Sequence, residues 1–243
     1  MTYEKSMFID RHETSFESAK VVLKLMKHEF PYIDRILDVG CGVGTFLKTA
    51  KDMGISFTQG MDGPWIDSEL LQIPQSDFLE VDLNDLPGLK ERFDLVICLE
   101  VAEHLLENSA EALVKFLTDH AEIVLFSAAV PGQGGNHHIN ERWQSYWAGI
   151  FLKFGFQPVD IIRPKIWENP NISYWYKQNT LVYVSSTRIL EKLPTNVTLD
   201  IVHPDMYLAH LRNSLTLKKA LKLLPKSVFS QLFKYPKRIF QLK

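Results

Sequence analysis

The chain has 243 residues, which favours one domain with or without an appendage, and its 46% hydrophobic content is ordinary for a globular protein. The start of the chain lacks the apolar segment of a secretory signal, and no run of about 18 apolar residues predicts a membrane-spanning helix. Two cysteines, Cys41 and Cys98, are too few for a disulfide framework. We therefore exclude a secreted disulfide scaffold and expect a cytoplasmic protein.

The formal net charge of −2 is unevenly distributed along the chain. Residues 211–243 contain nine Lys or Arg and no Asp or Glu, so the rest of the chain has 18 basic residues against 29 acidic ones. An acidic body is a poor match for nucleic acid, whose phosphates bind basic groups. A basic amphipathic helix is predicted over 214–224, and it could contact an anionic membrane surface or a partner. The alternative is a solvated helix that packs on the acidic body.

Hydrophobic periodicity predicts alternating helices and strands from residue 14 to residue 186. The predicted helices are 14–29, 44–54, 109–121 and 141–155. The predicted strands are 35–40, 56–62, 76–82, 93–100, 122–128, 157–164 and 179–186. This alternation predicts an α/β fold with a mostly parallel sheet and helices on both faces. We expect an N-terminal helical segment over 1–33, a main domain over 34–187 and a basic helical appendage over 188–243.

The segment LDVGCGVG, residues 37–44, places three glycines between a predicted strand and a predicted helix. Ligands of open parallel sheets bind beyond the carboxyl ends of the strands. The G-x-G-x-G spacing differs from the G-x-G-x-x-G of dinucleotide sites, and Asp38 would repel a phosphate but attract a cationic group. The segment therefore indicates a site for a cationic ligand, unless it is only a tight turn.

Three further carboxylates follow successive predicted strands. Asp62 ends the second strand and can accept hydrogen bonds from both hydroxyls of a ribose, or it caps a turn. Asp82 follows the third strand and can accept from an adenine amino group, although Asp77, Glu80 and Asp85 lie nearby in the sequence. Glu100 ends the fourth strand.

Four segments together resemble the class I S-adenosylmethionine-dependent methyltransferases in order and spacing: ILDVGCGVGTFL, GMD, DFLEVDL and FDLVICLEVAEHL. The resemblance covers residues 34–187. It implies a seven-stranded sheet whose last strand is antiparallel, with S-adenosyl-L-methionine as cofactor. The cofactor contacts that it implies are Asp38, Gly40 and Gly42 along the methionine part, Asp62 at the ribose, Asp82 and the Leu83 N–H at the adenine, and Glu100 near the amino-acid end. Cys41 and Cys98 are expected to be small buried residues, and His104 to pack or make a polar contact.

The loop PGQGGNHHINERW, residues 131–143, follows the fifth predicted strand, where related folds build the acceptor pocket. Its adjacent His137 and His138 allow three interpretations. One of them, with His138 preferred, acts as the catalytic base for a hydroxyl nucleophile. A metal site would need a third and a fourth ligand. Glu141 could join His137 only if the helix that follows the loop already began before Glu141. We expect no metal, because no cysteine or third ligand has an evident place. The third interpretation is a structural or substrate-contacting loop.

Aromatic and polar side chains accompany this loop and the stretch 165–179 between the two closing strands. The expected substrate contacts are Glu141, Trp143, Tyr146 and Trp175. The sequence thus predicts methyl transfer to a small-molecule or glycan-type acceptor, at oxygen. The alternatives are a non-catalytic cofactor-binding protein, and a methyltransferase whose basic tail brings it to a membrane-linked or macromolecular acceptor.

Overall fold

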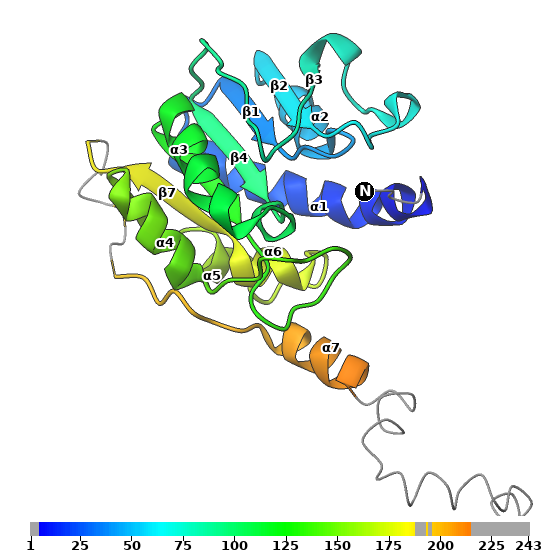
Figure 1. The fold of residues 1–243 in the computed structure, drawn as a ribbon, viewed down its shortest axis with the longest axis vertical. Coiled ribbons are helices and arrows are strands. Elements are labelled where there is room, and N and C mark those ends of the chain that lie inside the picture. Colours follow the sequence, from blue (N-terminus) through cyan, green and yellow to red (C-terminus); the bar gives the residue numbers. More distant parts are fainter. Residues whose placement is uncertain (1–4, 188–192, 194–195, 215–243) are drawn as a thin grey trace, which may run out of the picture. The chain divides into compact units, whose positions relative to one another are not determined.

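The computed structural model describes residues 5–187, 193 and 196–214. The chain forms two compact units, Met1–His203 and Pro204–Lys243 (Figure 1). In the second unit the described residues form one helix, α7 (Pro204–Ser214). All but the first residue of the basic helix predicted over 214–224 lie outside the described part, so the role of the tail stays a prediction. No helix among the described residues is long and apolar enough to cross a membrane.

A single sheet organises the first unit. In the described residues it has the strand order β3-β2-β1-β4-β5-β7-β6. The strands are β1 (Arg35–Val39), β2 (Phe57–Asp62), β3 (Phe78–Glu80), β4 (Leu95–Leu99), β5 (Ile123–Ser127), β6 (Phe156–Val159) and β7 (Leu181–Ser185). Only β7 is antiparallel to its neighbours, β5 and β6, while the other pairs are parallel. The predicted seven-stranded sheet with an antiparallel last strand is confirmed.

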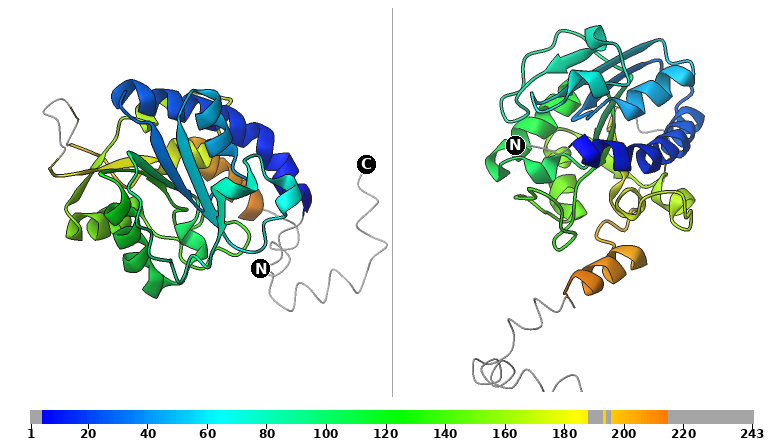
Figure 2. Two further views of the ribbon diagram at one scale, coloured as in Figure 1. Left: turned by 90° about the horizontal axis from the view of Figure 1, so that it is seen from above. Right: turned by 90° about the vertical axis from the view of Figure 1, so that its right-hand side faces the viewer.

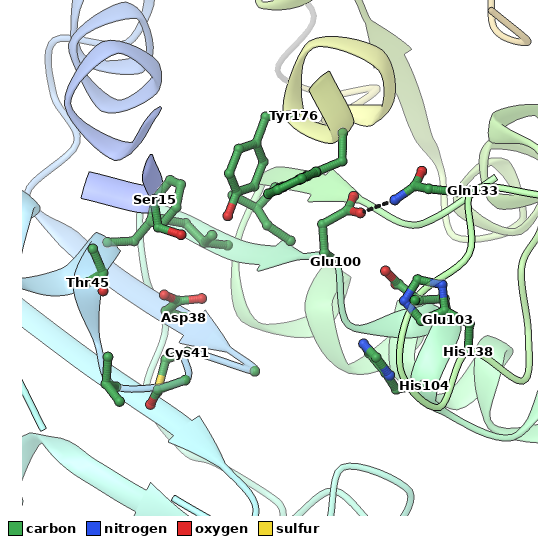
Figure 3. Close-up of a pocket in the computed structure, with 18 of the residues that line it drawn as sticks. Ser15, Asp38, Cys41, Thr45, Glu100, Glu103, His104, Gln133, His138 and Tyr176 are labelled. Carbon is green, nitrogen blue, oxygen red and sulfur yellow. Dashed lines mark hydrogen bonds between the residues drawn. The ribbon is translucent and has the colours of Figure 1, made fainter. Parts of the chain in front are cut away.

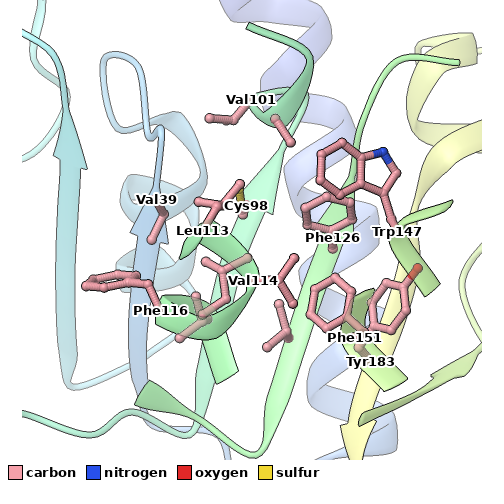
Figure 4. Packing of buried hydrophobic residues seen from close by; sticks show 14 of the residues in the cluster. Val39, Cys98, Val101, Leu113, Val114, Phe116, Phe126, Trp147, Phe151 and Tyr183 are labelled. Atoms are coloured by element: carbon pink, nitrogen blue, oxygen red, sulfur yellow. The ribbon is translucent and has the colours of Figure 1, made fainter. Parts of the chain in front are cut away.

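Helices cover both faces of this sheet (Figure 2). They are α1 (Lys5–Glu29), α2 (Thr45–Asp52), α3 (Ala110–His120), α4 (Gln144–Lys153), α5 (Arg163–Ile166) and α6 (Tyr174–Asn179). The side chains of α1 and α2 belong to the buried cluster on one face, and those of α3 and α4 to the cluster on the other. On the second face the rings of Phe151 and Tyr183 stack with centroids 3.7 Å apart (Figure 4). Trp147 lies in the same cluster, 1% exposed, and is a core residue.

Most predicted boundaries shift by one or two residues, and three of the differences affect the description of the site or its surroundings. The first helix begins at Lys5 and not at residue 14, because residues 5–13 contain no Gly or Pro that would end it. The strand predicted over 157–164 ends at Val159, since Pro164 cannot donate to a sheet but is favoured in the first turn of a helix, here α5. Trp143 has an extended backbone at the N-cap of α4, so Glu141 lies in a loop.

Candidate functional site

A cavity of about 310 Å³ opens at the carboxyl ends of β1 and β4 (Figure 3). Its lining comes from Ser15 of α1, the ends of β1 and β4 with the turns that follow them, the start of α2, the loop after β5, and α6. The strand order places β1 beside β4 and β4 beside β5, which is why turns far apart in the sequence meet here. This is the place where open α/β sheets bind their ligands.

The glycine turn forms one wall of the cavity. Gly40, Gly42 and Gly44 all have positive φ angles, of 79°, 55° and 85°, a conformation that glycine adopts without strain. A Cβ on Gly40 would lie 2.3 Å from the side chain of Val101, so this glycine allows the turn to pack closely. A Cβ on Gly42 would meet nothing within 4 Å. The backbone at Gly42 is therefore open to the cavity that it lines.

Two buried carboxylates lie beside this turn. Asp38 is 4% exposed and lines the cavity; burial, and next the negative charge of Asp62, raise its pKa to about 8. Asp62 is 6% exposed and accepts hydrogen bonds of 2.7 Å from the amides of Gly42 and Gly63. Burial raises the pKa of Asp62, and these amides oppose the shift. A cationic group entering the cavity would relieve the repulsion between the two carboxylates.

Glu100 follows β4 and is held from two sides. Its two carboxylate oxygens accept hydrogen bonds from the side-chain amides of Gln133, at 2.8 Å, and Asn179, at 3.0 Å. Burial raises the pKa of Glu100, while these amides lower it. Its φ angle of 56° is rare for a residue with a side chain. A strained backbone conformation persists only where several contacts hold it. Here the hydrogen bonds from the two side-chain amides hold Glu100.

A second polar cluster, formed by Glu103, His104 and His138, lies on the opposite wall from Asp38 (Figure 3). One potential ligand atom from each of the three side chains lies within 4.8 Å of the others. The rings of His104 and His138 meet edge-on with centroids 4.8 Å apart. Backbone hydrogen bonds hold the two segments together, because the amides of Ile139 and Asn140 donate to the carbonyl of Glu103. We call these three residues the Glu–His cluster.

Glu103 is fully buried, and among the described residues no side chain donates a hydrogen bond to its carboxylate; only the backbone amides of Glu103 and Ala129 act on it. Burial, and next the charge of Glu100, raise the pKa of Glu103 well above its ordinary value. Glu141 orients His138 by accepting a hydrogen bond of 2.9 Å from Nδ1. It also accepts from the amides of Gly132 and Gly134. Nδ1 of His138 is thus engaged, and its Nε2 is the nitrogen left for chemistry.

A family model described as a methyltransferase domain matches residues 11–203. The chain belongs to this family. Among curated proteins, the chloroplastic magnesium protoporphyrin IX methyltransferase of Arabidopsis thaliana is 28% identical over 92 residues, covering 36% of this chain and 30% of that protein. Ribosomal protein L11 methyltransferase of Thermosipho africanus is 28% identical over 150 residues, covering 58% of this chain and 55% of that protein. The chain thus spans about a third to about half of the length of these relatives.

Solved structures share the fold of this methyltransferase domain. Magnesium protoporphyrin IX methyltransferase from Synechocystis PCC 6803, with bound S-adenosylhomocysteine, has a TM-score of 0.55 at 20% identity, over 74% of this chain and 87% of that one. An amino pentose methyltransferase from Micromonospora echinaspora, with bound S-adenosylmethionine, has a TM-score of 0.52 at 14% identity, over 76% and 98%. The family and the fold predicted from the sequence are confirmed.

The methyltransferase domain brings only some of the predicted cofactor contacts to the cavity. Asp38, Gly40, Gly42 and Glu100 line it. Asp62 lies behind the glycine turn that it holds. Asp82 is exposed and accepts hydrogen bonds from the amide and side chain of Asn84, while Leu83 is buried in the hydrophobic core. The roles of Asp62, Asp82 and Leu83 at a cofactor stay predictions.

Only some of the residues predicted to act on the acceptor line the cavity. His138 and Trp175 line the cavity. His137 is exposed and outside the lining, and Trp143 is 40% exposed and also outside it. Tyr146 packs on the hydrophobic cluster beside α4. The cavity lining therefore does not support a catalytic role for His137 or substrate contacts by Trp143 and Tyr146.

Several residues in or beside the cavity were given no role at the site by the sequence-based prediction. Glu103 is one of them, although EVAEHL places it three residues after Glu100 and directly before His104. Gln133 and Asn179 carried no local signal, because the pairing of β5 with β7 brings them to Glu100. Cys41 lines the cavity and is half-buried, but burial raises the pKa of its thiol well above the ordinary value. Its thiol therefore stays protonated and is no nucleophile.

Proposed function

We propose that this protein transfers a methyl group from S-adenosyl-L-methionine to an oxygen of a small-molecule or glycan-type acceptor. The observation that carries the proposal is one continuous cavity with two different ends. Asp38 and the glycine turn form one end, and the Glu–His cluster forms the other. A cationic cofactor suits the first end, and a nucleophile that must lose a proton suits the second.

The cofactor end has the groups that an amino-acid moiety requires. Asp38 offers a carboxylate to an ammonium group, and the open backbone at Gly42 allows a close approach. The bound cofactor supplies a methyl group on a sulfonium: the acceptor oxygen forms a bond to the methyl carbon while the carbon–sulfur bond breaks and sulfur keeps the electron pair. The chain's own task is to align the acceptor and exclude water.

The acceptor end favours an oxygen nucleophile. A hydroxyl must lose its proton as it reacts, and the Glu–His cluster offers a buried carboxylate and two imidazoles at that place. Tyr174 and Trp175 add aromatic surface to the same cavity, and such surface packs against sugar rings or planar molecules. Of the two predicted catalytic histidines, His138 and His137, only His138 belongs to this cluster, and the proposal adds Glu103 and His104 to it.

Calorimetry with S-adenosylhomocysteine tests the cofactor end. We expect one site per chain and an affinity that falls at least about 10-fold in Asp38→Asn, because a charged hydrogen bond is lost. Asp119→Asn, an exposed residue of α3, is the control. Release of S-adenosylhomocysteine from S-adenosylmethionine, measured over a panel of catechols, sugars, peptides and amines, identifies the acceptor class. Turnover confined to amines or peptides would overturn the assignment to oxygen.

A further inference from the structure

The Glu–His cluster has the composition of a metal site. It combines one carboxylate with two imidazoles, and their ligand atoms lie within 4.8 Å of one another. Imidazole and carboxylate are the ligands that divalent first-row cations take from proteins. At metal–ligand distances of about 2.1 Å, ligand atoms in tetrahedral sites lie about 3.4 Å apart. Small side-chain rotations of His104 and His138 would therefore close the cluster around an ion.

Glu103 points to a ligand most directly. It is fully buried and lines the cavity, and among the described residues no side chain donates a hydrogen bond to its carboxylate; only the backbone amides of Glu103 and Ala129 lie close enough to act on it. Buried charges are normally paired or coordinate metals, because an isolated one is costly. No Lys or Arg lines the cavity, so among the described residues His104 and His138 are the basic side chains that lie beside Glu103 there.

His138 is already arranged as a ligand. Metal-bound histidines almost always donate their other ring N–H to a carboxylate or a carbonyl. Nδ1 of His138 lies 2.9 Å from a carboxylate oxygen of Glu141, and two loop amides fix that carboxylate. The imidazole is thereby oriented with Nε2 available. Gly135 leaves space for the ring, because a Cβ there would lie 2.2 Å from Nε2.

The charge around the cluster also favours a cation. Glu100 and Glu141 add negative charge close to Glu103, and both interact with it electrostatically. In the cavity lining, only protonated histidines could balance the charge of these carboxylates. A divalent ion would compensate them without any change in the backbone.

We propose that Glu103, His104 and His138 bind a divalent first-row cation at the acceptor end of the cavity, with Glu141 orienting His138. Three protein ligands leave at least one coordination position for water or for an oxygen of the acceptor. A cation at this place lowers the pKa of a bound hydroxyl, which gives its proton to solvent water, so His138 acts as a ligand and not as the base. This last point rests on the proposed methyl transfer to oxygen, whereas the cation site itself does not.

Manganese binding tests the site directly. The full chain is stripped with a chelator and titrated with Mn²⁺, while electron paramagnetic resonance follows the loss of the free-ion signal. We expect one Mn²⁺ per chain. Glu103→Gln and His104→Asn should weaken binding at least about 10-fold, because each removes a ligand; Glu141→Gln should weaken it by about 10-fold, as expected for a residue that orients a ligand.

Two exposed residues provide matched controls. His28→Ala on α1 and Glu111→Gln on α3 remove the same side-chain types away from the cavity, and both should bind Mn²⁺ as the wild type does. Thermal melts check that each variant is folded, and Glu103→Gln keeps the shape of the side chain. Equal Mn²⁺ affinity in the wild type, Glu103→Gln and His104→Asn would overturn the proposal.

The same proteins separate this inference from the proposed function. S-adenosylhomocysteine is titrated into the metal-free wild type and into Glu103→Gln. Failure to bind it would refute the cofactor assignment, while Mn²⁺ binding that depends on Glu103 and His104 would still support the cation site. Normal affinity for S-adenosylhomocysteine combined with no Mn²⁺ binding would refute the cation site alone.

Discussion

The side-chain amide of Asn179, the last residue of α6, donates a hydrogen bond of 3.0 Å to a carboxylate oxygen of Glu100 in the turn after β4. The same amide lies 2.9 Å from the side-chain oxygen of Gln133, so one residue joins three separate segments of the cavity wall. Asn179 is 2% exposed, which shields these bonds from water. The shape of the cavity at the end of β4 therefore depends on a buried amide far away in the sequence.

Asn179→Ala should destabilise the protein. The substitution removes the donor to one carboxylate oxygen of Glu100 and the shorter of two hydrogen bonds to the side-chain oxygen of Gln133, and an unsatisfied buried group costs about 1 to 3 kcal/mol. Urea unfolding followed by circular dichroism measures the loss of unfolding free energy. The exposed Asn171→Ala is the matched control, with an expected change within about 0.5 kcal/mol. Equal stability of the two variants would show that the hydrogen bonds of Asn179 do not contribute to the free energy of unfolding.

Asp38→Asn should stabilise the cofactor-free protein at high pH. Burial and the charge of Asp62 raise the pKa of Asp38 to about 8, above its value in the unfolded chain. The folded state therefore binds the proton more tightly, and the contribution of Asp38 to stability is lost as the pH rises from about 4 to about 8. At pH 8 the variant should gain on the order of 3 kcal/mol, and near pH 4 it should gain little. Urea unfolding at both pH values measures the difference, which would vanish if Asp38 were solvated.

The affinity for S-adenosylhomocysteine should rise with pH between about 6 and about 8. Only the ionised form of Asp38 attracts an ammonium group, and its pKa of about 8 means that most of the cofactor-free protein carries it protonated at pH 6. Calorimetry across this range should show a rise of about 10-fold or more for the wild type. Asp38→Asn should bind weakly at every pH. A parallel rise in the variant would assign the dependence to another group.

The sequence predicted the sheet well because local patterns determine it. Each buried strand is a short apolar run between turn residues, and strand-to-helix alternation leaves few topologies. Asp38 and the glycine turn were predicted for the same reason, since Asp38 lies near the end of β1 and the glycines follow that strand directly. Helix α1 was predicted too short because the capping signal at residue 14 marked its start, although residues 5–13 contain no Gly or Pro that would exclude a longer helix.

The acceptor end could be predicted only in part. His138 was identified from its loop, but its partners come from another turn, and the hydrogen bonds from Ile139 and Asn140 to Glu103 that join the two are backbone interactions without a sequence signature. The amide of Asn179 reaches Glu100 for a similar reason, through the antiparallel pairing of β7. Contacts between loops depend on strand order, and local periodicity does not encode it.

Gly40→Ala and Gly42→Ala form a matched pair within one turn. Both residues have positive φ angles, so each alanine meets backbone strain of about 1 to 2 kcal/mol. At Gly40 the new Cβ also collides with Val101, and overpacking adds about 1 to 3 kcal/mol. Urea unfolding should show the larger loss for Gly40→Ala. Gly42→Ala should lose less stability but bind S-adenosylhomocysteine more weakly, because its Cβ enters the cavity. Equal losses for the two variants would contradict this explanation.

Arg163→Ala should be the most destabilising of these substitutions. Arg163 is 1% exposed, and its guanidinium donates to Asp160 at 2.8 Å and to the carbonyls of Thr198 and Leu199. Removing one partner of a buried ion pair costs about 3 to 5 kcal/mol, and the segment at residues 198–199 loses its attachment as well. Arg163→Lys should recover only part of the loss, because an ammonium cannot reproduce the planar donor geometry. Urea unfolding measures both variants against Arg92→Lys at an exposed position, and a full recovery by lysine would show that charge alone is required.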